Sequence, residues 1–195
     1  MSIQEFMTGG KLLPITRWGE PVMHQQTEPI TVFDDELREL ARDMFATMEA
    51  AQGVGLAATQ VGKGISLFVF TCPDADDNIV SGAFCNPVVI LPEGNARNLQ
   101  SQDEGCLSLP GGYAPLARPD HAVCTGQDLY GQPYTVTGTG LLARCLQHET
   151  DHLNGIVFGD RLSNRVRKHL YQEHDAVADL YPSDWPVSPK LDHAQ

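Results

Sequence analysis

Apolar side chains recur every three or four positions along residues 34–52, which is the spacing of an amphipathic helix. The repeating positions are Leu37, Leu40, Ala41, Met44, Phe45 and Met48. Asp34 belongs to a residue type that caps helix N-termini, and Gly53 to one that ends helices. We therefore predict a helix between Asp34 and Gln52 whose apolar face packs on the core.

The segments that follow are rich in β-branched and aromatic residues, which favour strands. They are ISLFVF at 65–70 and AFCNPVVI at 83–90. A loop rich in Gly, Asn and Pro is expected next. Residues 121–138 predict two further strands, joined by a turn at Tyr130 to Pro133 in which Gly131 and Pro133 break the pattern.

A second helical stripe covers residues 141–154 and combines apolar and histidine positions, with Gly155 as its end. Its members are Leu141, Cys145, His148 and His152. Residues 162–181 predict a third helix, whereas residues 181–195 contain too much proline to continue one. We expect one domain at residues 1–180, an extended Pro-rich tail at residues 181–195, and no internal repeat.

Composition narrows the class of protein. With 195 residues, 42% of them hydrophobic, the chain can bury one full core. A net charge of -12 disfavours general attachment to nucleic acid or anionic membranes, so peptides, small molecules or proteins are the expected partners. Five cysteines without CxxC pairs indicate reduced thiols in a cytoplasm, and we find no targeting signal or membrane anchor.

The segment QHETDHLNG carries the strongest chemical signal. His148 and His152 are four residues apart on a helix, so both imidazoles project from one face and can share an ion. Glu149 lies between them, where a carboxylate can take a proton from water and return it to a leaving group. Two incidental histidines are the plainer alternative, but on an apolar stripe they would need polar partners. We therefore predict a metal site.

A catalytic divalent ion usually has three protein ligands, so a third one is needed. Glu173, Asp160 and Cys106 are the candidates, and Cys106 is favoured because an acidic residue and a glycine before it suit an exposed, shaped loop. A lone cysteine is ordinarily a small buried apolar residue. Cys145 lies one turn before His148, where it would crowd that ligand, and we interpret it as pocket wall.

The glycine-rich segment GVGLAATQ at residues 53–60 follows a helix end. Gly53 and Gly55 allow a ligand to approach the main chain, but the spacing does not match a phosphate-binding loop. Gln60 is the polar residue that remains. Its amide could donate a hydrogen bond to an oxyanion, although for this residue taken alone a surface glutamine is the favoured interpretation.

Together, GVGLAATQ, EGCLS and QHETDHLNG, in this order and at this spacing, resemble the three signature motifs of peptide deformylases. The resemblance extends from about Met44 to Leu162. It implies an α+β fold in which a central helix bearing the HExxH residues is surrounded by antiparallel β-sheets, with a C-terminal helix. It also implies hydrolysis of the formyl group from the N-terminal methionine of nascent polypeptides, with water attacking the formyl carbon.

The resemblance also implies a role for each matching residue. The metal ligands are Cys106, His148 and His152, the general acid/base is Glu149, and the oxyanion is held by Gln60 and the main-chain N–H of Leu107. Substrate main chain is expected beside Val54, Gly55 and Gly105, and the methionine pocket beside Val54, Leu107, Leu141 and Cys145. Arg144 departs from the apolar residue of many relatives. We expect its stem to cover the pocket and its head to reach water.

The resemblance implies one divalent ion, with Fe²⁺ expected first and Zn²⁺, Ni²⁺ or Co²⁺ as alternatives, because a Cys/His/His set suits all four. Two rival functions remain open: a small HExxH metallopeptidase with Glu173 as third ligand, and a noncatalytic protein with a structural metal.

Substrate partners would be N-formylmethionyl peptides and nascent chains. A basic patch on the third predicted helix leaves ribosome docking open, although acidic residues follow it and a solvated helix face explains it equally well. The patch consists of Arg161, Arg165, Arg167, Lys168 and His169. A monomer is the default expectation.

Overall fold

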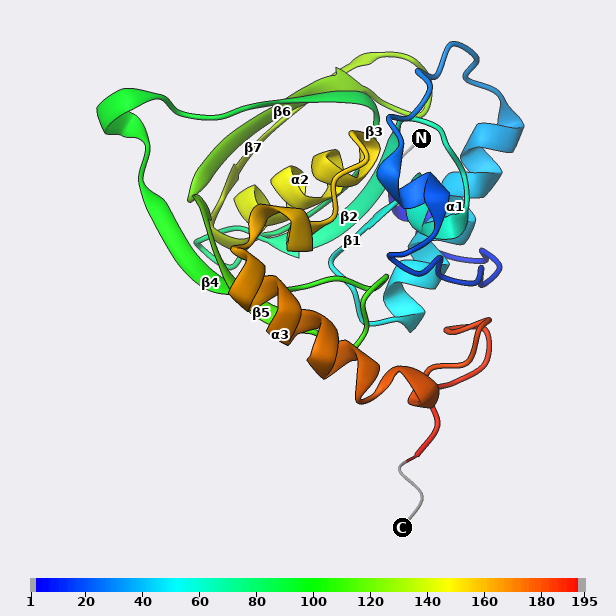
Figure 1. The fold of residues 1–195 in the computed structure, drawn as a ribbon. Helices are drawn as coiled ribbons and strands as arrows, with labels where there is room; N and C mark the ends of the chain where they lie inside the picture. The colour runs from blue at the N-terminus through cyan, green and yellow to red at the C-terminus, as the bar shows by residue number, and fades with distance from the viewer. Residues whose placement is uncertain (1–2, 193–195) are drawn as a thin grey trace.

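The computed structural model describes residues 3–192, which form a mixed α+β fold with antiparallel sheets, as expected (Figure 1). Its helices are α1 (Asp35–Ala50), α2 (Gly140–Leu153) and α3 (Asn164–Asp175). Its strands are β1 (Gly55–Ala57), β2 (Leu67–Pro73), β3 (Ile79–Ile90), β4 (Leu99–Gly105), β5 (Tyr113–Pro119), β6 (His121–Gln127) and β7 (Pro133–Thr139). One sheet has the order β1-β2-β3-β6-β7, and β4 pairs with β5 in a second.

Helix α1 confirms the helix expected at residues 34–52, with its apolar face in the core. The carboxylate of Asp34 accepts a hydrogen bond from the main-chain N–H of Leu37 at 3.0 Å, which caps the helix start. The helix ends at Ala50. Gln52, rather than Gly53, takes the left-handed backbone conformation, with φ 57°.

Helix α2 lies in the middle of the fold, with the two sheets around it (Figure 1). Leu142 and Leu146 are fully buried and belong to one apolar cluster with the phenylalanines of β2 and β3. The rings of Phe68 and Phe84 are 5.4 Å apart, within the range of favourable aromatic pairs. This packing fixes α2 against the five-stranded sheet.

Strands β4 and β5 replace what the sequence led us to expect as a loop between residues 90 and 120. They pair from Leu99 opposite Pro119 to Gly105 opposite Tyr113. The prediction was wrong because β4 has the sequence LQSQDEG, and its first five residues are exposed. A strand with no apolar alternation gives no period-2 signal, although its main chain pairs normally.

The C-terminal part packs against the rest of the fold. Helix α3 lies against β5, and residues after Tyr181 form turns rather than the extended tail expected from their proline content. Trp185 is only 8% exposed, and its ring meets that of Tyr181 edge to face at 5.2 Å. Burial of this aromatic surface stabilises the folded form of the segment. Within residues 3–192 no helix is long and apolar enough to cross a membrane.

Candidate metal centre

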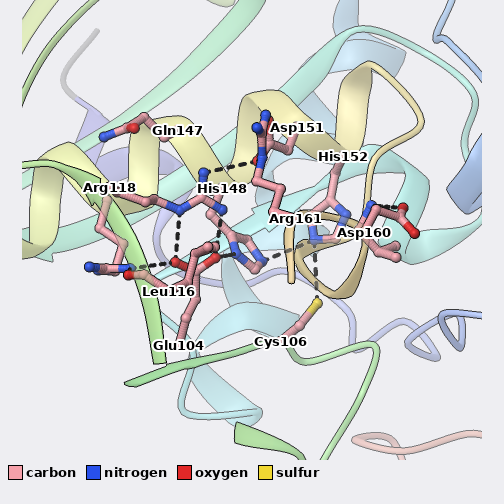
Figure 2. A network of polar contacts seen from close by, with 12 residues as sticks. Glu104, Cys106, Leu116, Arg118, Gln147, His148, Asp151, His152, Asp160 and Arg161 are labelled. Carbon is pink, nitrogen blue, oxygen red and sulfur yellow. Dashed lines mark hydrogen bonds and ion pairs between the residues drawn. The ribbon is translucent and has the colours of Figure 1, made fainter. Parts of the chain in front are cut away.

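Strand β4 and helix α2 bring the three expected ligands together. Cys106 directly follows β4, while His148 and His152 lie one turn apart on α2. The Sγ atom of Cys106 is 3.3 Å from Nε2 of His152, and the Nε2 atoms of His152 and His148 are 3.1 Å apart (Figure 2). Among the residues the structure describes, these three form the only group of Cys, His, Asp and Glu side chains arranged to hold a metal ion.

This donor set fits a divalent ion. Nδ1 of His148 contacts the carboxylate of Glu104 at 2.7 Å, which directs the lone pair of Nε2 toward Cys106 and His152. A thiolate and two imidazole lone pairs that face one another repel unless a cation lies between them. All three ligand atoms are within 4.8 Å of each other, so one ion can contact them all.

Glu104 fixes the orientation of His148. Its carboxylate is buried and also accepts two hydrogen bonds from Arg118, at 2.8 and 2.6 Å. Burial opposes its ionisation, yet the hydrogen bonds of Arg118 and His148 hold the pKa of Glu104 far below its usual range. We had interpreted this acidic residue as a sign of an exposed loop. It is instead an ionised carboxylate that supports a ligand.

The ionic network continues from Arg118 to Asp151, at 3.0 Å, and from Asp151 to Arg161 (Figure 2). Sequence reasoning missed these residues. The sequence does contain a signal that Arg118 is buried. Exposed and buried residues alternate along β5, and this alternation places Arg118 on the same buried face as Ala114 and Leu116. A cation on the inward face of a strand needs a buried anion, which here is supplied by β4 and α2.

Arg144 is placed differently from our expectation. Its guanidinium does not reach water, because it contacts the carboxylate of Glu104 at 2.8 Å and the carbonyl oxygens of Leu116 and Gln100 at 2.9 Å each. The residue is 6% exposed. Arg144 therefore ties α2 to both strands of the second sheet.

Gln60 is buried rather than on the surface. Its Oε1 accepts a hydrogen bond from the main-chain N–H of Ala57 at 2.9 Å, so its amide NH₂ faces Cys106 and Ser108. Its Nε2 lies 3.5 Å from the Cys106 sulfur. A donor is thus held beside the candidate metal ligands.

Glu149 points toward the glycine-rich segment. A Cβ added at Gly55 would lie 2.4 Å from its Oε1, so only glycine allows this approach of the main chain. Oε2 of Glu149 is buried and has no hydrogen-bond partner among the described residues. Burial raises the pKa of Glu149 to about 7, which suits a group that both takes and gives a proton near neutral pH.

A cavity of about 650 Å³ opens beside these groups. All the expected site residues line it except His152, which is fully buried behind the others. They are Val54, Gly55, Gln60, Gly105, Cys106, Leu107, Leu141, Arg144, Cys145, His148 and Glu149. The structure therefore brings the donors, the candidate base and the expected substrate wall to one place.

The rival third ligand lies elsewhere. Glu173 is on α3, where its carboxylate is 3.3 Å from the ring of His169, and it belongs to no group of possible ligands among residues 3–192. Part of the basic patch is paired with acidic residues: Arg161 contacts Asp151, and Arg167 lies 4.0 Å from Asp160. Pairing reduces the charge that this face offers to a partner.

Comparison with known proteins gives a consistent result. The family model for polypeptide deformylases matches residues 12–168. Peptide deformylase 1 of Streptomyces avermitilis is 47% identical over 89% of this chain and 80% of its own length. Peptide deformylase of Acidothermus cellulolyticus is 48% identical over 80% of this chain and 81% of its own.

Solved structures agree with the sequence comparison. The crystal structure of a peptide deformylase from Legionella pneumophila has a TM-score of 0.77 at 35% identity, over 87% of this chain and 96% of that one. A peptide deformylase from Synechococcus elongatus in complex with actinonin has a TM-score of 0.72 at 38% identity, over 86% of this chain and 90% of that one.

Proposed function

The chain belongs to the peptide deformylase family, and on this premise we propose the part that each site residue plays. The protein is a metal-dependent hydrolase that removes the N-formyl group from nascent peptides. The observation that carries the assignment of roles is the meeting of Cys106, His148 and His152 at the wall of a cavity that also contains Glu149.

Cys106, His148 and His152 hold one divalent ion in this proposal, with Fe²⁺ as the expected ion. When bound, the ion supplies Lewis acidity, which polarises a carbonyl oxygen and lowers the pKa of water. The protein's contribution is to hold the donor atoms in place. Glu104 does this for His148, and the backbone after β4 does it for Cys106.

Glu149 acts as the general acid/base. It accepts the proton of the attacking water and passes it to the departing amine of the methionine. Three features support this role: the side chain lines the cavity, its Oε2 has no protein partner among the described residues, and burial raises its pKa to about 7. A proton acceptor with these properties typically contributes about 10²–10⁴-fold to the rate.

Gln60 and the main-chain N–H of Leu107 stabilise the negative charge that develops on the formyl oxygen. The contact of Gln60 with Ala57 fixes the direction of its amide NH₂ before substrate binds. A donor that is already oriented loses no reorganisation energy during the reaction, which is why such contacts favour the transition state.

The substrate main chain lies along β1 and the end of β4. Strand β1 is at the edge of the five-stranded sheet, so one side of it is available for strand-like pairing with a peptide beside Val54 and Gly55. Gly105 faces the same cavity. The methionine side chain enters between Leu107, Leu141 and Cys145, while Arg144 supports this wall from inside the fold.

We further propose that the protein works as a monomer in the cytoplasm on nascent chains. Its five cysteines are free thiols, which suits a reducing compartment. A net charge of -12 opposes self-association.

The test measures formate release from formyl-Met-Ala-Ser under anaerobic conditions, with the metal content of each variant determined in parallel. Glu149→Ala is expected to keep its metal and lose about 10²-fold or more of kcat. Cys106→Ser is expected to lose most of the metal. Glu173→Ala is the matched control and should equal the wild type. Retention of one metal equivalent by Cys106→Ser, or its loss from Glu173→Ala, would overturn the ligand assignment.

A further inference from the structure

Residues 181–190 fold into a compact segment that we call the C-terminal hook. After α3 the chain forms this hook, which lies near the C-terminal end of α1 (Figure 1). The hook contains two aromatic rings, three prolines and one lysine that no role described above uses.

Contacts with the N-terminal part of the chain hold the hook in place. The carbonyl oxygen of Trp185 accepts a hydrogen bond from the main-chain N–H of Ile15 at 2.8 Å. Arg17 donates from Nη2 to the carbonyl oxygens of Tyr181 and Pro182, at 3.0 and 3.1 Å. Together with the burial of Trp185, these contacts make the hook a fixed wall.

That wall borders the cavity of the reaction site. The cavity lining includes Tyr181, Trp185, Pro186, Pro189 and Lys190, together with the residues assigned to catalysis. One continuous space therefore connects the catalytic groups to the hook. An extended peptide that pairs with β1 advances about 3.3 Å per residue and presents side chains alternately to each side. Its residues beyond the methionine need a surface to lie on.

The hook has two charged side chains, Asp184 and Lys190, and only Lys190 lines the cavity. Lys190 is exposed, and its Nζ lies 5.0 Å from the centre of the Tyr181 ring, an arrangement that attracts the ammonium group to the wall. The other cationic side chain of the lining, Arg144, is buried and occupied by Glu104. A bound peptide thus meets one accessible lysine at this end of the cavity.

We propose that the C-terminal hook is a binding subsite for the residues that follow the formylated methionine, with Trp185 and Tyr181 contacting the peptide and Lys190 favouring acidic side chains. This inference rests on the proposed function, since it extends the same substrate along the same cavity. The hook affects which peptides the protein prefers as substrates, and it takes no part in proton transfer.

Charge selection is tested with two formylated pentapeptides, formyl-Met-Ala-Glu-Glu-Ser and formyl-Met-Ala-Lys-Lys-Ser. Wild-type protein is expected to have the higher kcat/KM for the acidic peptide. Lys190→Glu should shift the ratio of the two kcat/KM values by about five-fold toward the basic peptide. Lys168→Glu, which makes the same charge change on α3, is the matched control and should keep the wild-type ratio. An unchanged ratio in Lys190→Glu overturns the proposal.

The aromatic contact is tested by peptide length. For Trp185→Ala, the ratio of kcat/KM for formyl-Met-Ala-Glu-Glu-Ser to that for formyl-Met-Ala should fall about ten-fold, chiefly through KM. Binding of the product peptide Met-Ala-Glu-Glu-Ser, measured by calorimetry, should weaken in parallel. Trp185→Phe preserves most of the packing and should give a smaller fall in the same direction if Trp185→Ala does not fold.

These outcomes separate the hook from the function itself. If the wild type releases no formate from formyl-Met-Ala, the proposed function fails. If it does, but Trp185→Phe lowers kcat/KM for both peptide lengths equally, the hook is only structural and the inference fails.

Discussion

The two sides of α2 are held by different kinds of interaction. Toward the five-stranded sheet, Leu142 and Leu146 pack in one apolar cluster with the phenylalanine rings of β2 and β3. Toward β4 and β5, α2 is joined by buried ion pairs, from Arg144 to Glu104 and from Asp151 to Arg118. The first side contributes stability in proportion to the apolar area it buries. The ionic side contributes less net stability, because burying charges costs desolvation energy. It does specify where polar atoms lie, because each buried charge needs a partner of opposite charge in contact with it.

The metal ligands lie on the ionic side of this division. His148 is oriented by Glu104, and the strand that carries Glu104 ends beside Cys106. The ion pairs and hydrogen bonds on this side thus position the metal ligands, while the apolar packing on the other side provides most of the stability of the fold. Three substitutions test this separation.

Glu104→Gln should have the largest effect. It leaves the buried Arg144 without a carboxylate partner and Arg118 with Asp151 alone, at a cost of about 3–5 kcal/mol in the free energy of unfolding. It also removes the carboxylate that orients His148, so metal affinity should fall about 10–100-fold. Urea unfolding and metal titration measure the two effects. Asp103→Asn, the same change at the adjacent exposed position, is the control. Wild-type metal affinity in Glu104→Gln would contradict the separation.

Leu146→Ala should act on stability alone. The side chain is fully buried against the sheet, and its removal leaves a cavity that costs about 2–5 kcal/mol. Metal affinity of the folded protein should stay near the wild-type value, because no contact of Glu104 changes. A loss of metal affinity as large as that of Glu104→Gln would show that both sides of α2 position the ligands.

Arg161→Ala should have the smallest effect, although Arg161 belongs to the same ionic network. Its side chain is 42% exposed, and Asp151 keeps the contact with Arg118. Exposed ion pairs contribute about 0–1 kcal/mol and weaken with salt. Urea unfolding at low and high salt measures the difference. A cost equal to that of Glu104→Gln would mean that burial does not decide the strength of these pairs.

The apolar side of α2 could be predicted from the sequence, and most of the ionic side could not. Helix periodicity depends on neighbours three and four residues away, so the helices at α1 and α2 were predicted within a few residues. The strands β2, β3, β6 and β7 could also be predicted, because their β-branched and aromatic residues are local signals in the sequence.

The network around Glu104 depends on partners far along the chain. Arg118 and Arg144 lie 14 and 40 residues from Glu104, and neither local pattern nor charge shows that they meet. Arg144 was therefore expected to reach water. The hook was missed for a similar reason, since its proline content indicates an extended chain while the hydrogen bond from Ile15 that anchors it is distant in sequence.

The sequence separation between Glu104 and its partners sets the order in which the site can form during synthesis. The pair between Glu104 and Arg118 closes within one hairpin and requires only a short loop. The contact between Glu104 and His148 spans 44 residues and requires α2 to dock first. A growing copy of this protein can therefore pair Glu104 with Arg118, with Cys106 already in the hairpin loop, well before the two histidine ligands are synthesised. It cannot assemble all three ligands until residue 152 has left the ribosome.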